Sequence, residues 1–172
     1  MKKKTFSLLA FSNFIANLQS KYLQLILHNI LTTNRSVAKY CNEQSHLCTF
    51  CNKESETVQH LFWSCEMINK FWKDLASMIN KRCVNVYNFS FSEKLVLFGQ
   101  SEFIYTDEVC NLIILIAKYF IYRSKVQNIS PNLKNFINTL FKRYEAEKLI
   151  AHNSQDFKNK WNQYLNLFKS LL

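Results

Sequence analysis

Glycine is almost absent from this chain of 172 residues, which contains one glycine (Gly99) and one proline (Pro131). Loops that cradle phosphates need glycine at fixed positions, so P-loop and dinucleotide-binding motifs are excluded. Tight β-hairpins also favour glycine at their turns, which argues against a strand-rich sandwich. Apolar residues still make up 48% of the chain and aromatic residues 15%, enough for a sizeable core. The sequence therefore predicts a folded protein without these glycine-dependent structures.

Apolar residues recur at three- and four-residue spacing along most of the chain, which is typical of helices. Such stripes predict helices within 68–79, 133–144 and 157–172, and a shorter apolar helix is predicted over 20–31. Residues 107–127 are apolar nearly all round, which predicts a central buried helix. The predicted fold class is mainly α: a helical bundle with a small inserted Cys3His zinc knuckle. We expect one compact domain with three parts, namely N-terminal helices (1–46), the knuckle with its following helix (47–82) and a basic helical region (83–172).

Capping residues predict where two helices begin. Ser130 is the expected N-cap of the helix within 133–144, with Pro131 at its first helical position. Ser90 and Glu93 have capping-box spacing ahead of a short apolar helix, which Gly99 is expected to close.

Positive charge is concentrated at both ends of the chain, whose formal net charge is +10. Residues 1–47 carry a net +5 and residues 118–172 a net +7, whereas residues 48–117 carry −2. A polyanion such as nucleic acid is the expected partner, with phosphate contacts from the two flanks.

No segment predicts a leader or a membrane span. The apolar run after Met1 is short and is followed by no clear cleavage site. The longest apolar run, Leu112 to Tyr122, is interrupted by Lys118 and has half of the ~20 residues that a span requires. We expect an intracellular protein with reduced thiols, and neither a membrane nor a small-molecule substrate as partner.

Four of the six cysteines lie within 25 residues, and three of them form with one histidine the pattern Cys48-x2-Cys51-x8-His60-x4-Cys65. The C-x2-C pair on a tight turn supplies two thiolates, and His60 and Cys65 at the end of a helical turn supply two further donors. Zinc prefers such a tetrahedral set, and four protein ligands leave no position for water. The pattern therefore predicts a structural Zn²⁺ site.

Other interpretations of these residues stay open at this point. Cys48 and Cys51 could form a redox pair, although such pairs are typical of an α/β frame. The spacing could arise by chance among buried cysteines, or His46 could replace His60 as the fourth ligand. The remaining residues of these types are expected to be core cysteines and satisfied or solvated histidines: Cys41, Cys83, Cys110, His28 and His152.

The knuckle and its surroundings resemble the C-terminal zinc-binding (CCHC) region of non-LTR (LINE-type) retrotransposon reverse transcriptases. The matching motifs are "ILTTN" over 30–34, "LC-x-FC" over 47–51, "ET-x-x-HLFW-x-C" over 56–65 and "FW" at 71–72. The similarity is strong over about residues 22–75 and weaker as far as about residue 150. The resemblance implies that Cys48, Cys51, His60 and Cys65 are the metal ligands.

The resemblance also implies a place in the retrotransposon ribonucleoprotein, in the nucleus or the cytoplasm. There the region follows the polymerase thumb and helps to bind element RNA or target DNA during target-primed reverse transcription. A polymerase needs paired aspartates for its two Mg²⁺ ions, but this chain has only Asp74, Asp107 and Asp156. We therefore expect a non-catalytic remnant of such an element, copied with 5′ truncation.

Nucleic-acid binding is the leading functional hypothesis, because basic side chains flank the knuckle and Phe50 lies between two of its cysteines, where it could stack on a base. Packing of Phe50 and simple solvation of the basic groups are the alternatives. A second hypothesis is a structural module that packs on the polymerase thumb, and a third is a thiol oxidoreductase. The predicted basic contacts are Arg35, Lys39, Arg123, Lys125, Lys134, Lys142, Arg143 and Lys148.

Overall fold

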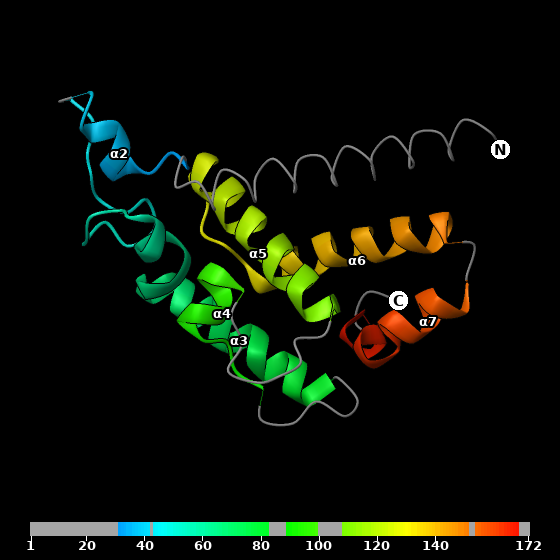
Figure 1. The fold of residues 1–172 in the computed structure, drawn as a ribbon. Coiled ribbons are helices and arrows are strands. Elements are labelled where there is room, and N and C mark those ends of the chain that lie inside the picture. The colour runs from blue at the N-terminus through cyan, green and yellow to red at the C-terminus, as the bar shows by residue number, and fades with distance from the viewer. Residues whose placement is uncertain (1–30, 42, 83–88, 100–107, 152–153, 169–172) are drawn as a thin grey trace.

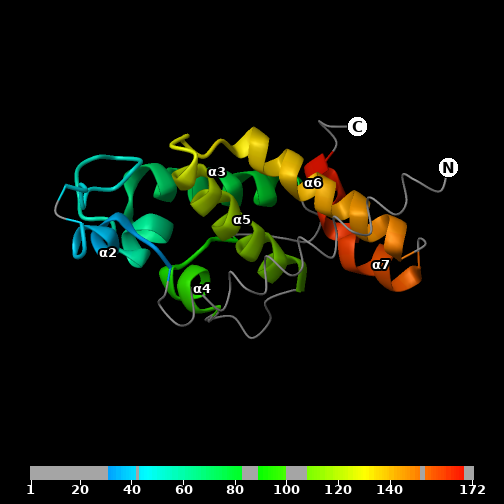
Figure 2. The same cartoon turned by 90° about the horizontal axis from the view of Figure 1, so that it is seen from above.

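The computed structural model describes residues 31–41, 43–82, 89–99, 108–151 and 154–168 (Figures 1 and 2). Its elements are α2 (Asn34–Ala38), a π-helical turn η1 (His60–Ser64), α3 (Glu66–Arg82), α4 (Glu93–Phe98), α5 (Glu108–Val126), α6 (Leu133–Ile150), α7 (Gln155–Trp161) and a 3-10 turn η2 (Asn162–Phe168). Within these residues the only β pairing is an isolated bridge between Leu47 and Ser55. The predicted fold class, mainly helical with an inserted Cys3His cluster, is confirmed. Apart from its last residue, the predicted helix over 20–31 lies outside the described residues.

Helices α3, α5 and α6 meet around one aromatic side chain. Phe71 of α3 lies with its ring centroid 6.3 Å from that of Phe120 on α5 and 5.4 Å from that of Phe136 on α6. Helix α5 buries most of its length, as the nearly continuous apolar run over 107–127 predicts. Burying a large apolar side chain stabilises a fold by ~1.5–3 kcal/mol, so this junction makes a large contribution to holding the three helices together.

A second aromatic cluster joins the C-terminal turns to α6. The ring centroid of Tyr144 lies 5.4 Å from those of Phe157 and Trp161 and 5.1 Å from that of Phe168. The apolar stripe predicted from residue 157 begins as α7 and continues as the 3-10 turn η2, in which Leu165 is exposed. The end of the stripe, residues 169–172, lies outside the described residues.

The predicted start of α6 is wrong by two residues. Asn132, and not Ser130, is the N-cap: its side-chain oxygen accepts hydrogen bonds from the backbone N–H groups of Lys134 (2.8 Å) and Asn135 (3.3 Å). Pro131 precedes the helix. Serine and asparagine are both strong N-caps by type, so the residue nearer the apolar stripe takes the role.

The start of α4 is displaced in the same way. Ser92, and not Ser90, caps the helix by accepting a hydrogen bond from the backbone N–H of Leu95 at 3.2 Å. The predicted end of the helix is confirmed, because Gly99 adopts a left-handed φ of 70° and donates its backbone N–H to the carbonyl of Leu95. Glycine tolerates this conformation at little cost.

Lys118 is a buried cation in the middle of α5. Its ammonium group donates hydrogen bonds to the carbonyls of Val96 (2.9 Å) and Leu97 (3.3 Å) near the end of α4, and lies 5.9 Å from the ring centroid of Phe62. Burial lowers the pKa of Lys118 to about 8. The lysine therefore links α4 to α5, although its charge is desolvated.

No helix in the described part of the chain is long and apolar enough to cross a membrane.

The depressed pKa of Lys118 predicts a pH-dependent stability. Between the folded pKa of about 8 and the ordinary value of 10.5, the unfolded chain binds more protons than the folded chain. The free energy of unfolding should therefore rise with pH over this window, by up to ~3 kcal/mol, from this group alone. Urea unfolding of wild type and Lys118→Met at pH 7.5, 9 and 10 checks this, because only the wild type should gain this contribution. Parallel pH profiles for the two proteins would contradict the prediction.

Candidate metal centre

Cys48 and Cys51 lie on a tight turn that is closed by backbone hydrogen bonds. The N–H of Cys48 donates to the carbonyl of Glu54 (2.8 Å), and the N–H of Asn52 donates to the carbonyl of Cys48 (2.9 Å). Asn52 has a positive φ of 53°, a left-handed conformation that asparagine tolerates better than most residues. The turn therefore forms without glycine. We call residues 47–65 the knuckle.

His60 and Cys65 are brought to one side of the knuckle by the π-helical turn η1. The N–H of Cys65 donates to the carbonyl of His60 at 3.0 Å, which is the five-residue hydrogen bond that defines a π-helix. The wider turn matches the five-residue spacing between the two donors. Trp72 of α3 donates its indole N–H to the carbonyl of Phe62 at 2.8 Å and so anchors the turn to the core.

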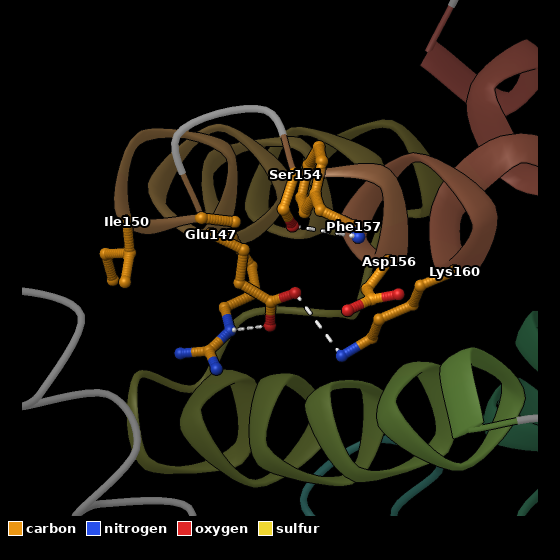
Figure 3. Close-up of a pocket in the computed structure, with 8 residues that line it drawn as sticks. Glu147, Ile150, Ser154, Asp156, Phe157 and Lys160 are labelled. Carbon is orange, nitrogen blue, oxygen red and sulfur yellow. Dashed lines mark hydrogen bonds and ion pairs between the residues drawn. The ribbon is translucent and has the colours of Figure 1, made fainter.

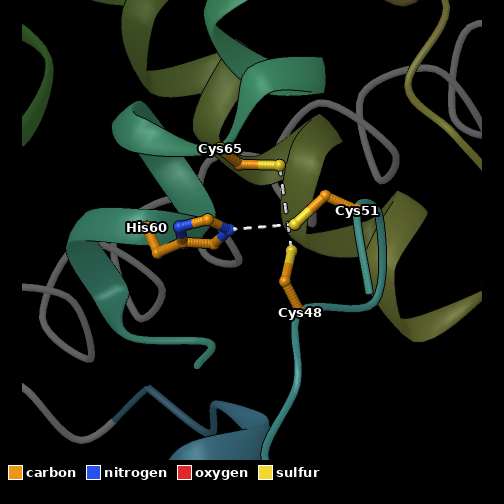
Figure 4. A group of neighbouring side chains, drawn as sticks. All are labelled: Cys48, Cys51, His60 and Cys65. Atoms are coloured by element: carbon orange, nitrogen blue, oxygen red, sulfur yellow. Dashed lines mark hydrogen bonds between the residues drawn. The ribbon is translucent and has the colours of Figure 1, made fainter. Parts of the chain in front are cut away.

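The four side chains converge on one point, and their donor atoms all lie within 4.8 Å of one another (Figure 4). The two sulfurs of Cys48 and Cys65 are 3.8 Å apart, and Cys51 Sγ lies 3.3 Å from His60 Nε2. In a tetrahedron with Zn–S of ~2.3 Å and Zn–N of ~2.0 Å, two sulfurs lie about 3.8 Å apart and a sulfur and a nitrogen about 3.5 Å apart. The cluster fits zinc in both donor chemistry and size.

The thiols of the cluster interact with each other, so metal binding is coupled to their deprotonation. The thiol of Cys48 donates to Cys65. This hydrogen bond, together with burial, raises the pKa of Cys48, whereas the same hydrogen bond lowers the pKa of Cys65 although burial opposes it. A metal ion requires these thiols as thiolates and releases their protons on binding. On the far side of the imidazole, His60 Nδ1 lies 3.3 Å from Glu54 Oε2, within ion-pair distance but without hydrogen-bond geometry. Such a carboxylate beside the second ring nitrogen is common behind metal-bound histidines.

The alternatives to this cluster find less support in the geometry. His46 is exposed and lies outside the group of four, with its carbonyl accepting the N–H of Glu56 at 2.9 Å. Cys48 pairs with Cys65 across the knuckle, which is not the arrangement of an isolated redox pair. The expectation that Cys41 is a core residue is wrong, because Cys41 follows α2 and is exposed, whereas Cys110 is buried. Residues 28, 83 and 152 lie outside the described residues.

Glu56 is an important residue that the sequence analysis missed. Its side chain is fully buried, and its two oxygens accept hydrogen bonds from the N–H of Asn34 (2.8 Å) and from the N–H and hydroxyl of Thr49 (both 3.0 Å). Lys125 of α5 lies 3.0 Å from the same carboxylate. The carboxylate therefore joins α2, the knuckle and α5. A buried glutamate leaves no signal in sequence alone, since glutamate is normally solvated.

Lys125, which is predicted to contact nucleic acid, takes part in this junction. Its side chain is 9% exposed, and it also donates to the carbonyl of Thr32 at 2.9 Å. Phe50, the predicted stacking residue, is half-buried and packs against the core. Of the other predicted contacts, five are exposed: Arg35, Lys39, Arg123, Lys134 and Lys142.

The two remaining predicted contacts on α6 are engaged with neighbouring side chains. Arg143 donates to Glu147 at 2.9 Å, beside a cavity of about 360 Å³ between α6 and α7 (Figure 3). Lys160 lies 3.5 Å from the same glutamate. Lys148 lies 3.8 Å from the carboxylate of Glu145 and 5.9 Å from the ring centroid of Tyr144. These charges are partly neutralised, so exposed cations are better candidates for phosphate.

A buried Cys3His cluster on a turn and a short helical segment is the arrangement of a structural zinc-binding region. Residues 3–72 match the family model described as zinc-binding in reverse transcriptase, which confirms the predicted recognition of such a region over this segment. This family model describes a zinc-binding accessory region and not a catalytic one. No curated protein and no solved structure matches the chain.

The cluster predicts one tightly bound zinc per chain. Loss of a residue that hydrogen-bonds to a metal ligand typically weakens metal binding by ~10–100-fold. Cys65→Ser removes a ligand itself, so it should weaken zinc binding by more than this. Competition with a chromophoric chelator measures the affinity, and elemental analysis measures the stoichiometry. Cys41→Ser is the matched control and should leave both unchanged, since Cys41 is exposed outside the cluster. Equal affinities for the two variants would contradict this assignment.

Glu56→Gln should destabilise the zinc-loaded protein by ~3–5 kcal/mol, because it leaves Lys125, whose side chain is only 9% exposed, without its counter-charge. Glu66→Gln is the matched control: its partner Lys53 is exposed, so the loss should stay below ~1 kcal/mol. Urea unfolding measures both. Lys125→Met in the Glu56→Gln background should recover part of the loss, and equal effects of the two single variants would contradict the proposed role of Glu56.

Proposed function

We propose that this chain is a non-catalytic, nucleic-acid-binding module of a LINE-type reverse transcriptase, held in shape by a structural zinc. The observation that carries the proposal is the Cys3His cluster within a segment that matches the reverse-transcriptase zinc-binding family. The "LTTN" and "HLFW" motifs around it support the LINE-type assignment. The module contributes to binding of element RNA or target DNA during target-primed reverse transcription, in a nuclear or cytoplasmic ribonucleoprotein.

Cys48, Cys51, His60 and Cys65 hold the zinc in this proposal. Four protein donors complete the tetrahedron, so the metal has a folding role and no open position for chemistry. Binding at such sites contributes ~10–16 kcal/mol in peptides, which is comparable to the stability of a whole domain. The zinc therefore fixes the turn carrying Cys48 and Cys51 against η1, from which α3 continues into the core.

The exposed basic groups supply the nucleic-acid contacts. Lys134 and Lys142 are both exposed on α6, where a spacing of eight residues lets them follow a phosphate backbone together. Arg123 is exposed near the end of α5, and Arg35 and Lys39 are exposed on and just after α2. Neutralising phosphates releases counterions, so affinity is expected to fall steeply with salt.

A structural module that packs on the polymerase thumb is the second candidate. It is favoured by two exposed apolar side chains three residues apart at the turn between α5 and α6, Val126 and Ile129, which are 69% and 57% exposed. Apolar groups that stay in water near one another are typical of a surface covered by a partner. In this case the isolated chain binds no nucleic acid.

Salt-dependent binding tests the proposal. Replacing Lys134 and Lys142 together with glutamine should weaken the binding of a single-stranded RNA and reduce the slope of log K against log salt by about 1.4, because each lost phosphate contact removes ~0.7. Fluorescence anisotropy of the zinc-loaded protein between 50 and 300 mM salt, roughly the range in which phosphate contacts weaken, measures the slope.

The control is the pair Lys73→Gln and Lys81→Gln on α3, which changes the net charge equally at two exposed positions outside the predicted set. It should leave the slope nearly unchanged. Absence of binding by the zinc-loaded wild type would contradict nucleic-acid binding and favour the thumb-packing module. Equal loss from both double variants would show that net charge, and not the α6 surface, determines affinity.

A further inference from the structure

Helix α2 lies at one end of the molecule in both views and is held there by the knuckle (Figures 1 and 2). Thr33 caps it in a reciprocal capping box with Ser36. The side chain of Asn34 donates to the carbonyl of Leu47 (2.7 Å) and to the hydroxyl of Thr49 (3.1 Å), and its backbone N–H donates to Glu56. This short helix is therefore fixed in position by hydrogen bonds to the knuckle, although it buries no residue fully.

The segment just after α2 displays one large aromatic side chain in water. Tyr40 is 88% exposed, the highest value among the large hydrophobic residues that the structure describes. Its backbone N–H donates to the carbonyl of Val37 at 2.9 Å, which fixes the main chain. Its ring has no aromatic contact or hydrogen bond among the described residues. Because its ring is exposed and its backbone is held in place, Tyr40 can stack on a planar group of a ligand.

The ring is accompanied by two cations. Arg35 and Lys39 are exposed and four residues apart, so they lie on the same side of α2, and Tyr40 follows directly. Like charges at this spacing repel each other and destabilise a helix. A polyanion removes this repulsion. Cations beside an exposed aromatic ring are the combination that binds single-stranded nucleic acid, where phosphates meet the cations and bases stack on the ring.

We propose that Tyr40 stacks on an unpaired base of a nucleic-acid strand whose phosphates are held by Arg35 and Lys39. This inference rests on the proposed function and gives it a contact that the sequence analysis did not foresee. Tyr40 replaces Phe50 as the stacking residue, because Phe50 is half-buried and packs against the core. Every base has a π-face, so the contact reads the single-stranded state and not a base sequence.

Tyr40→Ala should weaken binding of the zinc-loaded protein to a 15-nucleotide single strand by roughly five- to a hundred-fold. Tyr40→Phe should retain wild-type affinity, since the stacking face is kept. Binding to a duplex of the same sequence should change less than about twofold, because its bases are already stacked. Fluorescence anisotropy with matched RNA, single-stranded DNA and duplex DNA measures the three affinities and identifies which single strand is preferred.

The salt slope separates stacking from phosphate contact. Tyr40→Ala should leave the slope unchanged, whereas Arg35→Gln with Lys39→Gln should lower it by about 1.4 on a single strand. Phe98→Ala is the matched control, since Phe98 is 67% exposed at the end of α4 and lies outside the proposed surface. A wild type that binds no nucleic acid overturns the proposed function and this contact together. A wild type that binds, with unchanged single-strand affinity in Tyr40→Ala or an equal loss in Phe98→Ala, overturns the stacking contact alone.

Discussion

A buried carboxylate connects the metal-binding part of this protein to its helical body. Glu56 lies within the knuckle, between the two pairs of candidate zinc ligands, and its oxygens are shared by α2, by Thr49 of the knuckle and by Lys125 of α5. A carboxylate that is fully removed from water requires this number of partners. Loss of any one of them would leave charge or hydrogen-bonding capacity unpaired. The position of α2 and the docking of the knuckle on α5 therefore depend on the same group.

The zinc cluster and Glu56 stabilise different parts of the structure. Four metal donors close the knuckle on itself, joining the turn with Cys48 and Cys51 to η1, but a metal cannot orient segments that do not bind it. Glu56 supplies that orientation through directional hydrogen bonds. A buried ion pair contributes little net stability compared with an apolar pair, because desolvation offsets the attraction. Its contacts here join α2 and α5 to the knuckle.

The sequence predicts the features that depend on local spacing. The donors of the Cys3His cluster follow from a short pattern, and the buried stripes of α3 and α6 follow from helical periodicity. Features that depend on contacts between residues far apart in the sequence cannot be predicted from local spacing. Glu56 lies in the acidic middle of the chain, and nothing near it indicates that Lys125 is its partner. The helix starts at Asn132 and Ser92 were missed because competing cap residues stood two positions away.

The net charge of a segment likewise does not show which of its basic side chains are available to a polyanion. The basic C-terminal third includes Lys118, which is buried between α4 and α5, and Lys125, which neutralises Glu56, so part of its positive charge serves the fold. A phosphate would have to compete with these internal partners for the same ammonium groups. Exposed cations carry no such cost. The surface available to a polyanion is therefore smaller than the net charge suggests, and it includes α2, whose position the buried carboxylate determines.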